Sequence, residues 1–147
     1  MDTITALSII VGVDGSPSSR DALICAAEIA KAFGAPLRAV TTWEFPAMLE
    51  AGYLIEGWSP EGDAREILSA TIDEAFRGDV PAALTQVTAE GSTAAVLIDE
   101  SSRAQMLVVG SRGHGGFAGL MLGSVSSACA THARCPVLIM HGSAPTR

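Results

Sequence analysis

The feature that most constrains the fold is a short apolar run that passes directly into a glycine-rich segment and then into a segment of helical character. The apolar run is Met106–Val109, the glycine-rich segment is Gly110–Ser124, and the third segment is 125–132. This succession predicts a strand, a loop and a helix. The loop would then lie at the carboxyl end of a strand and face a helix amino terminus, where open α/β sheets bind ligands.

The composition of this loop indicates a site for phosphate groups. Residues without Cβ let the main chain adopt positive φ and let an anion approach the N–H groups closely. Gly123 and Ser124 begin the helix, which adds unpaired N–H groups, a hydroxyl and the positive end of the helix dipole. The segment lacks the Gly-Lys-Ser/Thr ending of a Walker A loop, and the dinucleotide fingerprint is more compact and belongs on a first strand. The alternative is a glycine-rich surface loop without a ligand.

The rest of the chain alternates between strand and helix patterns. Apolar and β-branched runs predict strands at 6–14, 36–43, 83–89, 105–109 and 135–140. Capping residues and apolar spacing predict helices at about 17–33, 59–77, 93–102 and 124–133. The long connection 44–58 has no clear period, and we expect a short helical piece around Ala47–Ala51 there.

These elements predict one α/β domain over residues 1–147, a three-layer sandwich around a five-stranded parallel sheet in the order 3-2-1-4-5. That order brings the ends of the first and fourth strands together, so Asp14 and the Gly110 loop converge at the topological switch point. We expect the first helix to bury Phe33, and the helix at 59–77 to bury Ile67 and Leu68. Cys25 and Cys129 fall on apolar helical faces, which favours buried thiols.

The spacing Gly110-x2-Gly113-x9-Gly123-Ser124 resembles the nucleotide-binding signature of the universal stress protein family, in its ATP-binding branch. The similarity extends to Val11–Pro17 and to Cys135–Ile139, and so spans nearly the whole chain. It implies an adenine nucleotide alpha hydrolase-like fold and ATP as the ligand. It also implies a nucleotide-dependent regulator in stress or growth arrest.

The resemblance further implies that Asp14 contacts the adenosine part of ATP and that the Gly12 backbone lies against the nucleotide. The end of the second strand would read the purine edge through Thr42, which we favour over Val40. The residues expected around the phosphates are Gly110, Ser111, Arg112, Gly113, His114, Gly115, Gly116, Gly123, Ser124, Val125 and Ser126.

Several of these residues have a plain structural alternative. Asp14 can cap the turn that follows it, and the two roles are compatible. Arg112 can project into solvent while the main chain binds the phosphates. Ser124 and Ser126 can cap the helix, and His114 lacks the partner that would make it a catalyst.

The same residues limit the reactions that the site could catalyse. Asp14 is a candidate ligand for Mg2+ bound with ATP, but we find no base or water-orienting residue, so hydrolysis should be slow and no catalytic residue is assigned. Three alternatives remain open. They are an adenine-nucleotide hydrolase or transferase on the same fold, a site for AMP or a cyclic nucleotide, and an interaction module without a ligand.

Composition limits the partners. Nine Lys and Arg against sixteen Asp and Glu give a formal charge of -7, which argues against nonspecific nucleic-acid binding and against an anionic membrane surface. The amino terminus lacks the features of a signal peptide, and no apolar stretch approaches membrane-spanning length, so we expect a cytoplasmic protein. The family commonly dimerises through its last strand, and the apolar edge Val137–Met140 makes a homodimer physically reasonable.

Overall fold

Five parallel strands form the centre of the structure, a computed structural model that describes residues 7–47, 51–52, 56–112 and 122–142. The strands are β1 (Ser8–Gly12), β2 (Leu37–Trp43), β3 (Leu84–Glu90), β4 (Ala104–Gly110) and β5 (Val137–Met140). The helices are α1 (Pro17–Phe33), α3 (Pro60–Phe76), α4 (Thr93–Ser101) and α5 (Ser124–His132). The sheet order is β3-β2-β1-β4-β5, which confirms the predicted fold class.

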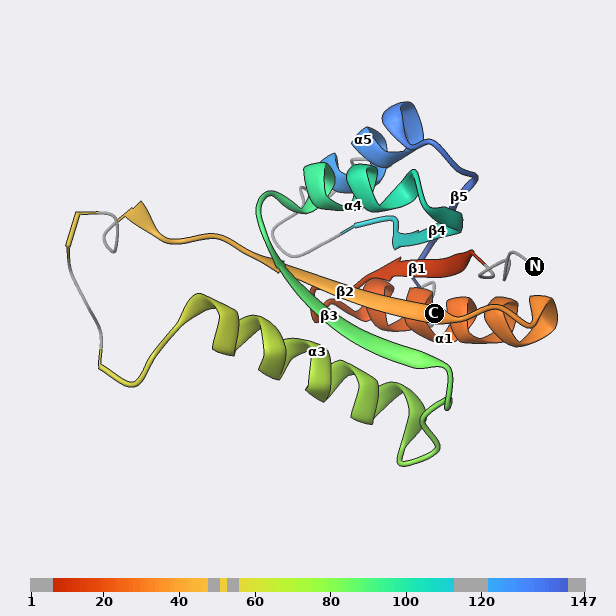
Figure 1. Ribbon diagram of the computed structural model, residues 1–147, viewed down its shortest axis with the longest axis horizontal. Helices are drawn as coiled ribbons and strands as arrows, with labels where there is room; N and C mark the ends of the chain where they lie inside the picture. Colours follow the sequence, from red (N-terminus) through yellow and green to blue (C-terminus); the bar gives the residue numbers. More distant parts are fainter. Residues whose placement is uncertain (1–6, 48–50, 53–55, 113–121, 143–147) are drawn as a thin grey trace, which may run out of the picture.

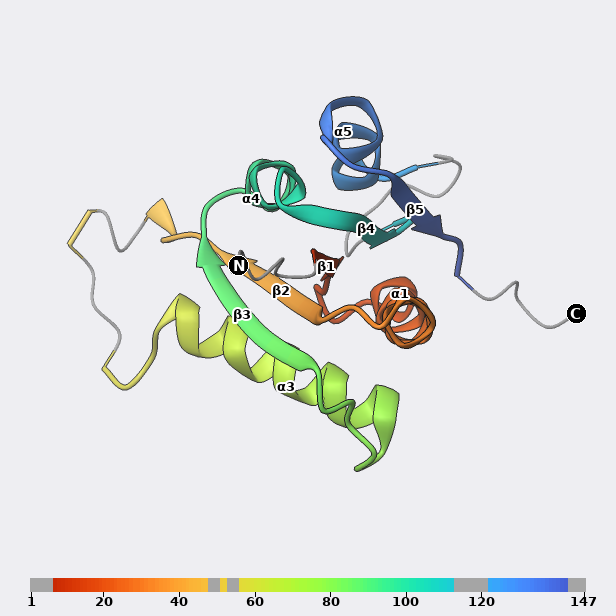
Figure 2. The same cartoon turned by 45° about the vertical axis from the view of Figure 1, so that its right-hand side comes forward.

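The helices cover both faces of the sheet. In Figures 1 and 2, α1 and α3 lie on one side, and α4 and α5 lie on the other. The central strand β1 is therefore buried on both faces, and Ile9, Ile10 and Val11 are each at most 1% exposed. This explains why its sequence is apolar at successive positions. Among the described residues, no helix has the length and apolar character needed to cross a bilayer.

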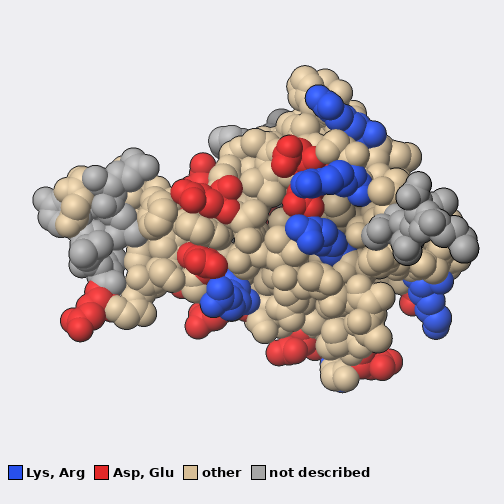
Figure 3. Space-filling view, in the orientation of Figure 1, with Lys and Arg blue, Asp and Glu red and all other residues tan. Residues whose placement is uncertain are grey.

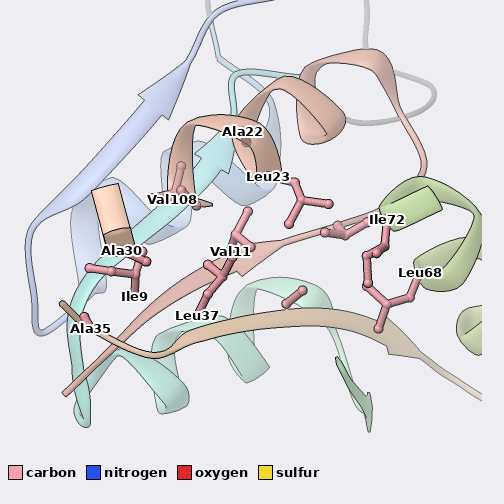
Figure 4. Close-up of a cluster of buried hydrophobic side chains, with 13 residues drawn as sticks. Ile9, Val11, Ala22, Leu23, Ala30, Ala35, Leu37, Leu68, Ile72 and Val108 are labelled. Carbon is pink, nitrogen blue, oxygen red and sulfur yellow. The ribbon is translucent and has the colours of Figure 1, made fainter. Parts of the chain in front are cut away.

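The core consists of two hydrophobic clusters separated by the sheet. Figure 4 shows the first, in which Ile9, Val11 and Leu37 from the strands meet Leu23 of α1 and Leu68 of α3. The second lies under α4 and α5. Ile10, Val40, Leu97, Leu107, Val109 and Cys129 are among its buried members. Successive strand residues point to opposite faces, so a single apolar strand supplies both clusters.

The helix ends follow the predicted capping residues. The Ser16 hydroxyl accepts a hydrogen bond from Ser19 N at 3.2 Å at the start of α1, and Gly34 ends that helix with φ of 62°. The Ser59 hydroxyl accepts from Gly62 N at 3.0 Å at the start of α3. The last helical residue is Phe76, and the C-cap Arg77 adopts the left-handed conformation with φ of 48°.

Two predicted core residues are exposed. Phe33 is 55% exposed and Ile67 is 39% exposed. Phe33 is the last residue of α1, where the chain turns at Gly34 toward β2. On α3 the buried face follows Ala64, Leu68, Thr71 and Ile72. That face is narrower than the apolar pattern indicates, so Ile67 lies on its solvent side.

The cysteines serve packing. Cys129 is fully buried, and burial raises the pKa of its thiol from the ordinary 9.0 to about 11, with Cys135 adding to the shift. Burial also raises the pKa of Cys135, while a hydrogen bond with the Leu107 backbone opposes the rise. Both groups are therefore neutral thiols near pH 7 and behave as small apolar side chains. Cys25 is only half-buried, so the prediction of burial is confirmed for Cys129 alone.

The described parts of the connection between β2 and α3 extend away from the body of the molecule on the left of Figure 1. Within it, Ala51 N donates to Ala47 O at 3.0 Å, the hydrogen bond of one helical turn. The expected helical piece is supported at these two positions, and the residues between Ala47 and Ala51 lie outside the described part of the chain.

Candidate functional site

The carboxyl ends of β1 and β4 lie next to each other at the carboxyl-terminal edge of the sheet, the side on which the parallel strands end. The two strands pair directly, with Val11 beside Val108. The turn that contains Asp14 and the start of the glycine-rich segment at Ser111 therefore meet at this edge. A hydrogen bond joins the two regions, because the Ser18 hydroxyl in α1 donates to the Arg112 carbonyl.

Asp14 organises the turn between β1 and α1. Ser16 N donates to Asp14 Oδ1 at 2.9 Å, and the Ser16 hydroxyl donates to the same oxygen. The Asp14 N–H donates to Ser19 Oγ at 3.3 Å. The carboxylate thus has the turn-capping role common for Asp. Since the residue is half-buried at the edge of the sheet, a second role toward a ligand stays a prediction.

Packing limits the space for a side chain at two glycines of the predicted site. A Cβ on Gly12 would lie 2.9 Å from Leu97 Cδ1 of α4. A Cβ on Gly110 would lie 2.9 Å from the carbonyl carbon of Ser18, a backbone atom. Neither glycine has positive φ. The first turn of α1 therefore comes close enough to Gly110 to favour a glycine there, and a role of Gly110 toward an anion stays a prediction.

Ser111 closes the base of the glycine-rich segment. Its carbonyl accepts hydrogen bonds from Gly123 N at 2.7 Å and from the Ser126 hydroxyl at 3.0 Å. Its own N–H donates to the Met140 carbonyl at 2.7 Å. The Gly123 amide and the Ser126 hydroxyl proton, both expected near phosphates, are thus used within the protein. Ser126 is 2% exposed and also lies 3.1 Å from the Gly123 carbonyl oxygen.

The start of α5 keeps three N–H groups without helical acceptors. Gly123 is its N-cap, with extended φ of -72° and ψ of 170°, and no side chain in the described part of the chain caps the helix. The first hydrogen bond of the helix runs from Ser127 N to Gly123 O. The N–H groups of Ser124, Val125 and Ser126 precede it and carry the positive end of the helix dipole. Ser124 is exposed and Val125 is half-buried, so this turn can meet a ligand.

The rest of the glycine-rich segment is only partly described. Arg112 is exposed, in agreement with the alternative that its side chain projects into solvent. Gly113, His114, Gly115 and Gly116 lie outside the described residues.

Thr42 lies at the end of β2, two residues beyond the last β1–β2 pair, Gly12 with Val40. The Val40 carbonyl is occupied, because it accepts from Val13 N at 2.8 Å. Alternate residues of a strand direct their N–H and C=O groups to the same side. The main-chain groups of Thr42 therefore face the β1 side beyond the end of that ladder. The Thr42 hydroxyl lies 2.6 Å from that of Thr93, at the start of α4.

The basic side chains on the face drawn in Figure 3 are unevenly distributed. In Figure 3 most of the basic side chains lie toward the right, whereas the carboxyl ends of the strands lie toward the left. In the described part of the chain, no cluster of three or more His, Cys, Asp or Glu residues could hold a metal ion.

Sequence reasoning missed the two hydroxyls that tie this edge to the helices. Ser18 reaches Arg112, 94 positions away, and Thr93 reaches Thr42, 51 positions away. Both residues follow helix N-caps, Ser16 and Ser92. The sequence shows at each position only a small polar residue in the first turn of a helix. That pattern does not indicate which distant residue the hydroxyl contacts.

Comparison with known proteins reveals related chains. Universal stress protein Rv2005c of Mycobacterium tuberculosis (strain ATCC 25618 / H37Rv) is 35% identical over 141 residues, a match covering 92% of this chain and 45% of that protein. The chain spans about half the length of the curated relatives it matches. A solved universal stress protein in complex with cAMP is 29% identical, with a TM-score of 0.67 and coverage of 95% of this chain and 99% of its own.

A second solved structure shares the fold at lower identity. The universal stress protein from Archaeoglobus fulgidus in complex with dAMP is 20% identical, with a TM-score of 0.69 and coverage of 93% of this chain and 99% of its own. The model of the universal stress protein family matches residues 7–141. The match therefore covers every strand and helix of the sheet layers. The predicted family is confirmed, and the chain belongs to the universal stress protein family.

Proposed function

We propose that this chain binds ATP at the carboxyl ends of β1 and β4 and acts as a nucleotide-dependent regulator in stress response or growth arrest. The observation that carries the proposal is the start of α5. Ser111 holds this turn beside β4, and three consecutive N–H groups there lack helical acceptors. Phosphate groups bind well at such a position because N–H donors and the helix dipole act together. A similar universal stress protein is known in complex with cAMP.

The proposed pose runs across the edge of the sheet. The phosphates lie against the N–H groups of Ser124, Val125 and Ser126. The adenosine part extends past Gly12 and Asp14, and the purine edge meets the main chain of Thr42. Thr42 is suited to this role because its N–H and C=O face the β1 side beyond the last β1–β2 pair. An acidic chain can bind a polyanion this way because the attraction comes from local dipoles.

Magnesium would enter with the nucleotide. Mg2+ is commonly bound by one or two carboxylates together with phosphate oxygens and water. Asp14 is the carboxylate in the turn that follows β1, and it also holds the Ser16 turn. We infer that Asp14 would contribute a single ligand to an ion held chiefly by the phosphates.

We infer that hydrolysis is slow at most. Phosphoryl transfer requires a positioned metal, a group that orients water and positive charge at the leaving phosphate. Asp14 is the acidic group in the turn that follows β1, and its Oδ1 already accepts two hydrogen bonds from Ser16. A protein that retains its nucleotide without rapid turnover is suited to regulation.

The test is direct binding by equilibrium dialysis, with ATP, ADP, AMP and cAMP measured alone and in competition. We expect ATP to be retained and to displace the others. Mass spectrometry of the small molecules that copurify identifies the ligand independently. Preferential retention of cAMP or AMP would replace ATP with that ligand, a choice that the cAMP-bound relative makes worth testing. Retention of none of the four at millimolar concentration would favour an interaction module.

We also propose a homodimer through β5. This strand forms one edge of the sheet, and all four of its residues are half-buried in the isolated chain. The carbonyls of Pro136 and Met140 face β4, so the main-chain groups of Val137 and Ile139 face outward. An apolar edge of this kind readily pairs with a second strand.

Sedimentation equilibrium should give twice the monomer mass for the wild-type chain. The Ile139→Pro variant should be monomeric, because proline removes the outward N–H at a position where an edge strand tolerates it. Circular dichroism of the variant checks that the fold is retained. A wild-type chain that stays monomeric at high concentration would refute the dimer.

A further inference from the structure

Ser18 is a buried residue in the first turn of α1, and its hydroxyl forms a hydrogen bond with a residue outside that helix. It is 8% exposed, and its Oγ donates to the carbonyl of Arg112, 94 positions along the chain. Arg112 is the last described residue before the interior of the glycine-rich segment. The hydrogen bond therefore fixes the direction in which the chain enters that segment.

The space around Ser18 is shaped to admit this side chain. At the end of β4, a Cβ on Gly110 would lie 3.0 Å from Ser18 Cβ and 2.9 Å from its carbonyl carbon. After β5, a Cβ on Gly142 would lie 3.9 Å from Ser18 Cβ, an ordinary contact. Ser18 thus lies between the ends of two strands, and the absence of a side chain on Gly110 makes its position possible.

The far end of the glycine-rich segment is tied to the same place. Ser111 O accepts from Gly123 N and from the Ser126 hydroxyl, and Ser111 immediately precedes Arg112. The start of α5 is consequently linked through Ser111 and Arg112 to Ser18. If Arg112 moved, Ser111 would move with it, and the hydrogen bonds of Ser111 O would shift the N–H groups of Ser124 and Val125.

We propose that Ser18 is a positioning residue for the nucleotide site, which it serves without contacting the nucleotide. This inference rests on the proposed function, because it assigns Ser18 the task of setting the phosphate-binding turn of α5 relative to Asp14. A hydroxyl that only satisfied a buried carbonyl would affect stability alone. A positioning hydroxyl affects the glycine-rich segment and ligand affinity as well.

The test compares Ser18→Ala with Ser101→Ala in the full chain. Ser101 is a matched control, because it is 1% exposed and its hydroxyl also joins two elements, accepting from Arg134 N at 2.9 Å. We expect Ser18→Ala to weaken ATP binding by about 3- to 10-fold, the effect of one neutral hydrogen bond. Trypsin should also cleave after Arg112 severalfold faster. Ser101→Ala should change neither quantity.

The outcomes separate the two proposals. Wild-type affinity and wild-type cleavage at Arg112 in Ser18→Ala would overturn the positioning role, and so would a lowered melting temperature with unchanged ATP affinity. A wild-type chain that binds none of the nucleotides would overturn the proposed function and the role of Ser18 in it. In that case the cleavage rate still decides whether Ser18 anchors Arg112.

Discussion

Replacing Ser124 with proline should weaken ATP binding by about 10- to 100-fold while the fold is retained. Ser124 is the first residue of α5, and proline is favoured there because the missing N–H has no helical acceptor. Gly123 is already extended, with φ of -72° and ψ of 170°, which suits the residue before a proline. The substitution therefore removes one donor to the phosphates, and hydrogen bonds to charged groups contribute about 1.5–3 kcal/mol.

The matched control is Ser124→Ala, which removes the hydroxyl and keeps the N–H. If the main chain binds the phosphates, this variant should retain affinity within about 3-fold, since a neutral hydroxyl contributes less than a charge-assisted bond. Isothermal titration calorimetry with ATP gives both affinities, and thermal melting checks the fold. Equal affinity of Ser124→Pro and the wild type would show that this amide does not bind the ligand. A large loss in Ser124→Ala would assign the binding to the side chain.

The fold could be predicted because its signals are local. Ile9–Val11 is buried on both faces, and this is visible as a continuous apolar run. Ser16, Gly34 and Ser59 have the capping chemistry that begins and ends helices, and each does so in the structure. The order of five strands then follows from the parallel connections and the family resemblance. Periodicity does not give the width of a buried helical face, so the expected burial of Ile67 is wrong, and Phe33 is exposed because it is the last residue of α1.

The site was harder to predict because its contacts join distant positions. The glycine pattern predicts ligand binding, and the close approach of α1 to Gly110, which the sequence does not reveal, gives this glycine a packing role as well. Gly123 has φ of -72°, so positive φ does not explain its identity. The occupation of its N–H by Ser111 O depends on tertiary structure. The start of a helix at Ser124, which the sequence does predict, is governed by helix geometry alone.

Replacing Gly110 with alanine should destabilise the chain by about 1–3 kcal/mol, the usual cost of overpacking a well-filled site. The new Cβ would lie 2.9 Å from the Ser18 carbonyl carbon, a backbone atom that no side-chain rotation can move aside. The first turn of α1 must therefore shift. Because this turn also holds Asp14 through Ser16 and Ser19, ATP binding should weaken together with stability.

Gly142→Ala is the control on the other side of Ser18. Its Cβ would lie 3.9 Å from Ser18 Cβ, an ordinary van der Waals distance, and the residue is exposed, so we expect a change within about 0.5 kcal/mol. Urea unfolding of both variants measures the difference, with an unchanged slope indicating that the unfolded states are alike. Should Gly110→Ala unfold at the wild-type midpoint, α1 does not approach β4 as closely as the structure requires. The packing explanation for a glycine at position 110 would then fail. Close approach of a ligand would remain as the explanation.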